Sequence, residues 1–141
     1  MWKWRRTEEK SGQGAGEART GPLRWKTYSA ETGYVYQYVL RGSRPWRQGS
    51  TEGSEYVFHA SRDRRDVFAV SVVLTATALA EWGRANAREL RPAERYAVAK
   101  LSLQAAFDEY ETTERFQAPI VPGPGTIGHH LKTLGIETTT D

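Results

Sequence analysis

The feature that most constrains the fold is an almost uninterrupted apolar run, Val67–Leu74 (VFAVSVVL), near the middle of the chain. Its β-branched residues and its shortness favour a strand over a helix. Apolar residues at both odd and even positions are typical of a strand buried on both faces, so we expect a central strand here. Tyr34–Arg41 and Glu55–Ser61 predict two further strands because they combine aromatic and β-branched residues. We expect the intervening segment, Gly42–Gly53, to be a long polar loop.

Helical spacing replaces the strand pattern after this run. The apolar residues of Ala78–Leu90 recur every three or four positions, and Thr75 or Thr77 precedes them as a candidate cap. A second helix is predicted from Pro92 to about Tyr110 or Glu114, since proline is tolerated in a first helical turn. A last short helix is predicted, with Thr126 as its cap and Gly135 as its stop.

These elements predict an α+β fold. We expect a small antiparallel sheet of three or four strands, followed by two packed helices and a short C-terminal helix. Residues 1–22 are predicted to be a flexible, Gly-rich basic tail, and residues 23–117 the α+β domain. Residues 118–141 then form a Pro/Gly loop, the short helix and a tail.

Strand alternation divides the side chains of the sheet into two sets. One set is large and aromatic and includes Tyr34, Tyr36, Tyr38 and Phe58. We expect it to lie beneath the helices, whose residues are smaller; the alternative is an exposed stacking platform of tyrosines. The other set would then form an open face with an exposed apolar patch made of Val35, Val39, Val57, Ala69 and Val73.

Composition limits the chemistry that is available. The 141 residues include no cysteine, which excludes disulfides and thiolate chemistry. The first residues are charged, no signal peptide is recognisable and no apolar run is long enough to span a membrane. We therefore expect a soluble, cytoplasmic protein. The net charge of +3 is unevenly spread, because residues 1–65 carry 13 Lys and Arg against 7 Asp and Glu.

This basic first half favours nucleic acid as the ligand of a non-catalytic binding protein. Basic side chains near strand ends grip phosphates, and a tryptophan stacks on a base. The competing interpretation is a solvated rim of ordinary surface arginines, since acidic residues are interleaved and no nucleic-acid motif is present. The predicted contacts are Arg24, Lys26, Arg41, Arg44, Trp46, Arg47, Arg62, Arg64 and Arg65.

A second hypothesis is a structural or accessory subunit of a larger assembly or homo-oligomer. It follows from the apolar open face and from two tryptophans near the N-terminus that look suited to docking. The predicted protein interface consists of Val35, Gln37, Val39, Val57, His59, Trp2 and Trp4.

An enzyme is the third and weakest hypothesis. His59 and Ser71 share the predicted open face, but no sequence signal supplies a partner for the histidine. His129 and His130 are adjacent, so on a helix they point about 100° apart and do not form a metal-binding pair. The acidic residues that end the second helix are expected to be solvated. We therefore predict no catalytic residue, no metal and no cofactor.

Overall fold

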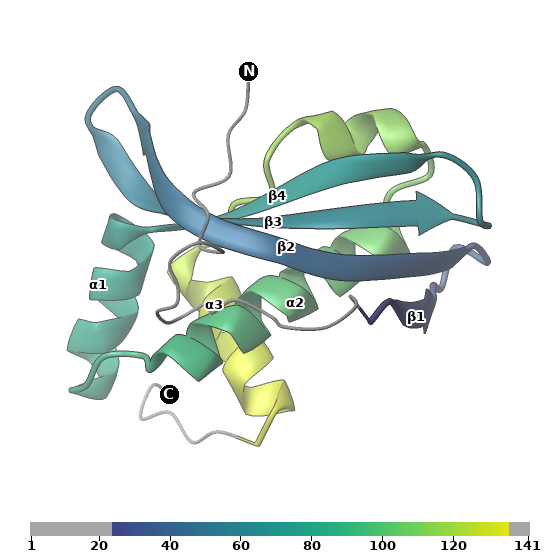
Figure 1. Cartoon of the computed structure of the whole chain (residues 1–141). Helices are drawn as coiled ribbons and strands as arrows, with labels where there is room; N and C mark the ends of the chain where they lie inside the picture. The colour runs from purple at the N-terminus through teal and green to yellow at the C-terminus, as the bar shows by residue number, and fades with distance from the viewer. Residues whose placement is uncertain (1–23, 136–141) are drawn as a thin grey trace.

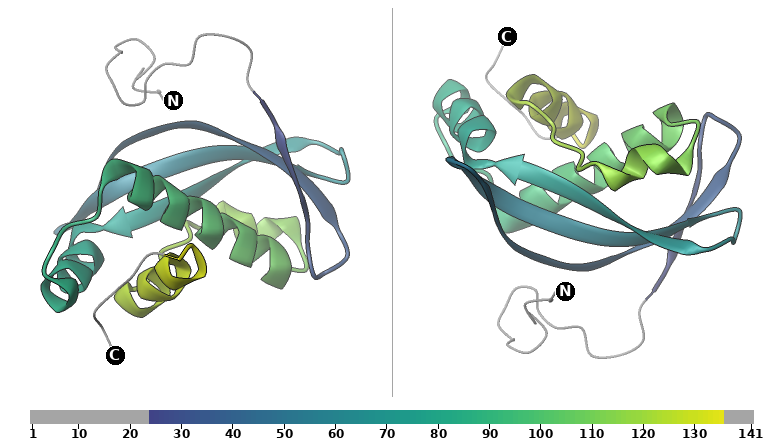
Figure 2. Two further views of the ribbon diagram at one scale, coloured as in Figure 1. Left: turned by 90° about the horizontal axis from the view of Figure 1, so that it is seen from below. Right: turned by 90° about the horizontal axis from the view of Figure 1, so that it is seen from above.

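The computed structural model describes residues 24–135 of the chain. Its elements are, in order, β1 (Lys26–Ser29), β2 (Val35–Gln48), β3 (Thr51–Arg62), β4 (Val67–Thr75), α1 (Ala76–Asn86), α2 (Pro92–Glu109), the 3₁₀ helix η2 (Thr113–Gln117) and α3 (Pro124–Thr133). The four strands form one antiparallel sheet in chain order. All the helices lie on one face of this sheet (Figures 1 and 2). The predicted α+β class is confirmed, whereas the tail predicted for residues 1–22, with Trp2 and Trp4, lies outside the described residues.

The aromatic set of strand residues forms the core, as the alternation predicts. Tyr36 and Phe58 are fully buried on the face beneath the helices. The ring of Phe107, from α2, stacks on Tyr36 with 3.9 Å between ring centroids. Burying a side chain of this size stabilises the fold by about 1.5–3 kcal/mol. Tyr38 is buried too, so the tyrosine row is a packing surface and not a stacking platform.

The predicted loop at Gly42–Gly53 is wrong, because β2 and β3 continue through it as a long hairpin. Its tip is a two-residue turn in which Gly49 has a φ of +63°, a conformation that favours glycine. Position 53 also requires glycine, but for a steric reason: a Cβ there would lie 2.5 Å from the Leu74 carbonyl oxygen. The polar composition that suggests a loop reflects instead a hairpin whose tip extends beyond the end of β4 (Figure 1).

The prediction that Val67–Leu74 is a central strand is also wrong. β4 is the last strand of the sheet, and its outer neighbour is a single parallel bridge between Val72 and Ile120. That bridge carries two backbone hydrogen bonds, from Val73 to Ile120 and from Ile120 to Ser71. The chain after η2 therefore protects part of an edge that would otherwise expose unpaired backbone groups.

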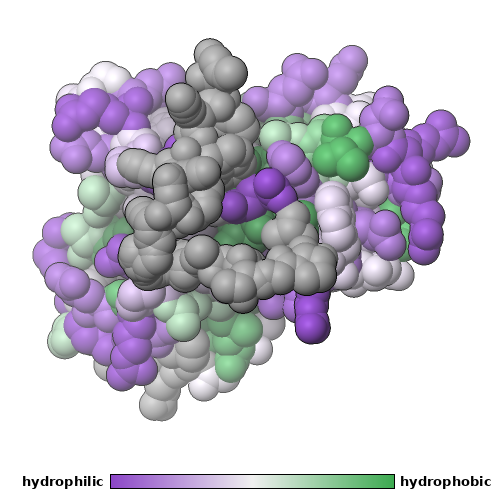
Figure 3. All heavy atoms as spheres, in the orientation of Figure 1, coloured by the Kyte–Doolittle hydropathy of each residue, from purple (hydrophilic) through white to green (hydrophobic). Residues whose placement is uncertain are grey.

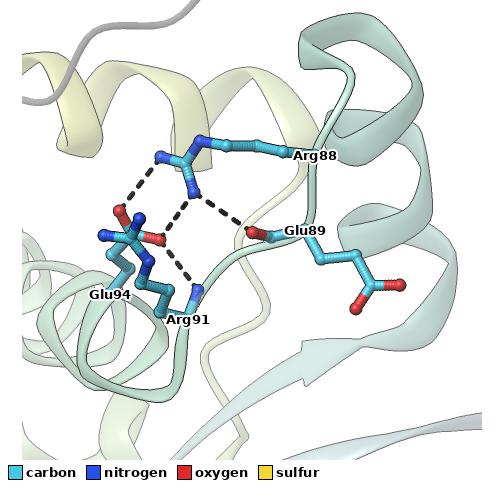
Figure 4. Close-up of polar contacts among 4 residues, drawn as sticks. All are labelled: Arg88, Glu89, Arg91 and Glu94. Carbon is cyan, nitrogen blue, oxygen red and sulfur yellow. Dashed lines mark hydrogen bonds and ion pairs between the residues drawn. The ribbon is translucent and has the colours of Figure 1, made fainter.

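Capping groups hold the first two helices. The side chain of Thr75 accepts a hydrogen bond from the amide of Ala78, which fixes the start of α1. At the start of α2, Glu94 accepts from the amide of Arg91 at 2.8 Å and from both terminal nitrogens of Arg88 at 3.0 Å (Figure 4). The Arg88 hydrogen bonds hold the pKa of Glu94 below its usual range. This network ties the α1–α2 connection to the first turn of α2.

The C-terminal end of α2 is anchored to β1. Asp108 accepts a hydrogen bond from the Tyr28 hydroxyl at 2.7 Å and one from the amide of Glu31 at 2.9 Å. Burial, and then the bond to Asp108, raise the pKa of Tyr28 to about 12. The expectation of solvated acids at this helix end is therefore wrong for Asp108, because an edge strand and the turn after it supply its donors.

The last helix begins three residues earlier than predicted, because its N-cap is Gly123 and not Thr126. Gly123 caps α3 and Pro124 occupies its first turn, so the helix does not wait for Thr126. Gly135 follows the helix with a φ of +83°, in agreement with the predicted stop. Ile127 and Leu131 are fully buried and join the same core as Tyr36. Among the described residues, no helix is long and apolar enough to cross a membrane.

Candidate functional site

The arginines predicted to bind a ligand fall mainly into two groups, one at each end of β3. The arginines of the hairpin group form ion pairs with carboxylates on the neighbouring strand. Arg44 Nε lies 2.8 Å from Glu55 Oε1, with the two side chains only 18% and 13% exposed, and Arg47 lies 3.2 Å from Glu52. The hydroxyl of Ser71, on β4, donates to the other oxygen of Glu55 at 2.5 Å. These contacts link β2, β3 and β4 near the point where the hairpin extends beyond β4.

The second group lies at the β3–β4 turn and begins with Arg62, the last residue of β3. Its guanidinium carbon sits 3.7 Å from the centroid of the Tyr34 ring, and its Nη1 donates to the carbonyl of Glu111 at 2.9 Å. A cation over an aromatic face is stabilised by the ring quadrupole. Arg62 is therefore held in one orientation between the start of β2 and the segment before η2.

The backbone of this turn is strained. Asp63 and Arg64 have φ values of +55° and +61°, in the left-handed region, although neither is glycine. The amide of Arg65 closes the turn on the Arg62 carbonyl at 3.1 Å. Asp63 also exchanges hydrogen bonds with Val35, which fixes the turn to the start of β2. Strain of this kind is frequent at binding sites, where it orients functional side chains.

A cavity of about 350 Å³ opens beside this turn. Its walls combine arginines from the turn, carboxylates and two phenylalanines. The lining residues are Arg62, Arg65, Asp66, Phe68, Ala69, Thr113, Glu114, Phe116 and Gln117. The cavity thus lies between the start of β4 and η2, two segments that are separated by about 40 residues in the sequence.

The cavity offers three kinds of contact to a ligand. Phe68 is half-buried and packs against the buried Phe116, with 5.4 Å between ring centroids. Arg65 is exposed and makes no ion pair with any residue that the structure describes, so its guanidinium is available to an anion. Asp66 and Glu114 add hydrogen-bond acceptors. Figure 3 shows hydrophilic side chains gathered at the end of the molecule where this turn lies.

The remaining predicted contacts are spread along the sheet rather than gathered at the cavity. Arg24 and Lys26 belong to the first edge of the sheet, Arg41 to the β-bulge of β2, and Trp46 to the hairpin. Only Trp46 of these four is half-buried, and the other three are exposed. The structure therefore brings Arg62 and Arg65 together, with Arg64 adjacent in the turn, and leaves the others apart.

The face opposite the helices is less open than predicted. Val35 is 40% exposed and Ala69 is also exposed, as expected. The prediction of an exposed patch is wrong for Val39, Val57 and Val73, whose exposed fractions are 4%, 0% and 0%. Val57 lies between Gly42 of β2 and Ser71 of β4, and Val73 lies between Glu55 of β3 and the segment at Ile120, whereas Val35 lies at a strand end.

The face opposite the helices also carries polar residues. Gln37 and His59 are half-buried on it, and the cation of Arg41 lies close enough to affect the histidine. Burial lowers the pKa of His59, and the Arg41 charge lowers it further. Ser71, which shares the face, donates to Glu55 and not to His59, so these two residues do not form a nucleophile–base pair. Among residues 24–135 no three metal-ligating side chains cluster.

Of the nine residues that line the cavity, only Arg62 and Arg65 are among the contacts predicted from the sequence, and the seven that are missed include Phe68, Glu114 and Phe116. Strand parity assigns Phe68 to the core, but its position near the start of β4 leaves it half-buried. Phe116 is a lone aromatic residue in a polar stretch, TERFQ, which is the only sequence signal for η2. No local pattern predicts that this stretch folds back beside the β3–β4 turn.

Comparison with known proteins gives no further assignment. No protein-family model matches the chain, no curated protein is significantly similar to it, and no solved structure is significantly similar to its fold.

Proposed function

We propose that this protein is a non-catalytic binding protein for single-stranded nucleic acid, and that the cavity at the β3–β4 turn takes one of its nucleotides. The observation that carries the proposal is the composition of the cavity wall, where Arg62 and Arg65 stand beside Phe68 and Phe116. Guanidinium groups bind phosphate oxygens, and aromatic rings stack on unpaired bases whatever their sequence.

The dimensions and polarity of the cavity agree with this ligand. Its volume of about 350 Å³ lies within the range of small-ligand sites, about 300–1,000 Å³. Asp66 and Glu114 balance the two arginines, so the wall as a whole is not strongly positive. Carboxylates accept hydrogen bonds from the exocyclic amino groups of bases, which an unpaired nucleotide presents. We therefore expect a preference for single strands over duplexes.

The test is an equilibrium titration of the full chain with fluorescent oligonucleotides: single-stranded DNA, single-stranded RNA and a duplex, each at two salt concentrations. The single strands should bind more tightly than the duplex, and their affinity should fall as salt rises because bound cations are released. A chain that binds no oligonucleotide at low salt would falsify the proposal.

A second candidate, a subunit of a protein assembly, is favoured by one separate observation. Trp25, Val35 and Val67 are 42%, 40% and 55% exposed. Strand register and alternation place Val35 and Val67 on the face that the helices leave uncovered, and Trp25 immediately precedes β1. Exposed apolar side chains that gather on one face are typical of a protein interface.

Light scattering coupled to size exclusion, at several protein concentrations, tests this second candidate. Self-association through the uncovered face should raise the mass with concentration, and Val67→Asp should abolish the increase because it places a charge in the apolar contact. Leu134→Asp is a matched control, since Leu134 is similarly exposed, at 42%, but follows α3. A strictly monomeric chain that co-purifies with no protein would count against an assembly role.

A further inference from the structure

A second cavity lies on the helical side of the molecule, away from the β3–β4 turn. It has a volume of about 130 Å³ and lies between α2, α3 and the segment around Ile120. Its lining is apolar at Ala105, Ala106, Ile120, Val121 and Pro122, and polar at Ser102, Glu109, Tyr110, Thr126 and His130. It shares no lining residue with the cavity at the turn.

Two of the polar side chains that line this cavity, Ser102 and His130, are buried without hydrogen-bond partners among the described residues. Ser102 is 4% exposed and His130 is 8% exposed. Neither Ser102 Oγ nor His130 Nε2 has a hydrogen-bond partner among the residues that the structure describes. Leaving a buried polar group unpaired destabilises the fold, so two such groups beside one cavity indicate a site that a polar ligand completes.

The lining restricts the chemistry of that ligand. An apolar cavity of about 150 Å³ holds a molecule the size of benzene, so a cavity of about 130 Å³ is of the size that takes a single six-membered ring. Burial and the neighbouring His129 lower the pKa of His130, so its ring is neutral at pH 7 and has one nitrogen that accepts a hydrogen bond. Ser102 both donates and accepts. A hydroxyl group satisfies both residues, since it donates to one and accepts from the other.

We propose that the cavity between α2 and α3 is a binding site for a small uncharged ring compound that carries a hydroxyl group, as phenol does. Ser102 and His130 bind the hydroxyl, while Ala106, Ile120 and Pro122 contact the ring. This site is separate from the proposed nucleotide site, and the two proposals are tested independently.

Phenol and benzene are the two probes that test the proposal, in NMR titrations of the full chain that follow the His130 ring signals. Phenol should shift these signals saturably, and benzene should bind at least about tenfold more weakly, because it leaves both polar groups unpaired. This comparison needs no variant and is therefore independent of any effect on folding. Failure of both probes to shift His130, or equal affinity for the two, would overturn the proposal.

Variants then locate the hydroxyl contact. Ser102→Ala should weaken phenol about tenfold and leave benzene unchanged, since only phenol uses the serine. Lys132→Ala is the matched control: Lys132 also lies in α3 but is exposed and outside the cavity, so the affinity for both probes should persist. A Ser102→Ala protein that binds phenol as tightly as the original chain would contradict the assignment.

Discussion

The arginines at the two ends of β3 have the same chemistry but different partners. At the hairpin end, Arg44 and Arg47 face carboxylates on the neighbouring strand. At the turn end, Arg62 rests on an aromatic ring and a backbone carbonyl, and Arg65 has no carboxylate partner among residues 24–135. Both groups are equally basic in the sequence, yet only the second lines the cavity at the turn.

The difference shows that positive charge in a sequence does not by itself locate a binding site. An arginine whose charge is already matched stabilises the fold, and removing it leaves a buried carboxylate unpaired. An arginine without a carboxylate partner costs the fold little and is available to a ligand. The two ends of β3 should therefore respond in opposite ways to substitution: stability should change at the hairpin and binding at the turn.

Charge reversal at the turn should have the largest effect. The double variant Arg64→Glu/Arg65→Glu should weaken single-strand binding about 100-fold, since the charge-assisted contact of Arg65 is replaced by repulsion and the adjacent Arg64 adds a second repulsive charge. The matched control is Arg41→Glu/Arg47→Glu, which changes net charge equally at two residues that do not line the cavity, and we expect it to weaken binding only a few fold through the loss of long-range attraction. Fluorescence anisotropy measures the oligonucleotide affinity of both variants. Equal losses of affinity would show that the two ends of β3 do not differ in binding.

Loss of charge at the hairpin should affect stability instead. Glu55→Gln keeps the shape of the side chain but removes the anion that Arg44 and Ser71 share. The free energy of unfolding should fall by about 1–3 kcal/mol, because the group is largely buried. Urea denaturation measures the change, while oligonucleotide affinity should stay constant. An affinity that falls with the stability would place the hairpin in the binding site.

The aromatic wall of the turn cavity gives a third, smaller effect. Phe68→Leu preserves apolar volume but removes the ring face, so single-strand binding should weaken about tenfold, the range expected for one lost base stack. Phe68→Tyr, which keeps the ring, serves as its control and should retain affinity. If leucine binds as well as phenylalanine, stacking at this position has no part in the site.

A substitution that relieves backbone strain at the turn should raise stability and weaken binding. Arg64→Gly should raise the free energy of unfolding by about 1 kcal/mol, since glycine adopts the left-handed conformation without a Cβ clash. The same variant should bind single strands a few fold more weakly. Thermal denaturation and anisotropy on one preparation test both halves, and an Arg64→Gly variant that is less stable than the original chain would show that the turn is not strained.

The smallest expected effect is on the pH dependence of stability, and it comes from the ion pair between Arg88 and Glu94. The hydrogen bonds from Arg88 lower the pKa of Glu94, so the folded chain binds this proton less readily than the unfolded chain. Its contribution to stability is complete above the ordinary carboxyl range and is lost as pH falls from about 5 through the lowered pKa. Glu94→Gln should flatten this part of the profile, measured by urea denaturation from about pH 6 to about pH 3. An unchanged slope would mean that the pair does not form in solution.

Much of the fold follows from local patterns. Alternation in Tyr34–Arg41 and Glu55–Ser61 assigns Tyr36 and Phe58 to the core, and the structure buries both. Pro92 and Gly135 mark a helix start and a helix stop where they are predicted. These features depend on neighbours within a few residues, which is why local patterns are sufficient to predict them.

Other features depend on partners that are distant in the sequence. The polar hairpin is stabilised by pairing between strands, so its composition resembles a loop when read alone. The position of β4 at the sheet edge depends on Ile120, and the turn cavity depends on Phe116, both of which follow the two intervening helices. Local patterns therefore place Arg62 and Arg65 among nine candidates but cannot select them.

An NMR map of the contacts between the chain and a short single-stranded oligonucleotide distinguishes the two ends of β3 without any substitution. Amide and arginine side-chain signals are followed during the titration. The largest shifts should lie at Arg62, Arg65, Phe68 and Phe116, with Arg47 and the hairpin tip unchanged. Shifts that centre on the hairpin, or none at the turn under conditions where the oligonucleotide binds, would contradict the assignment of the site to the β3–β4 turn.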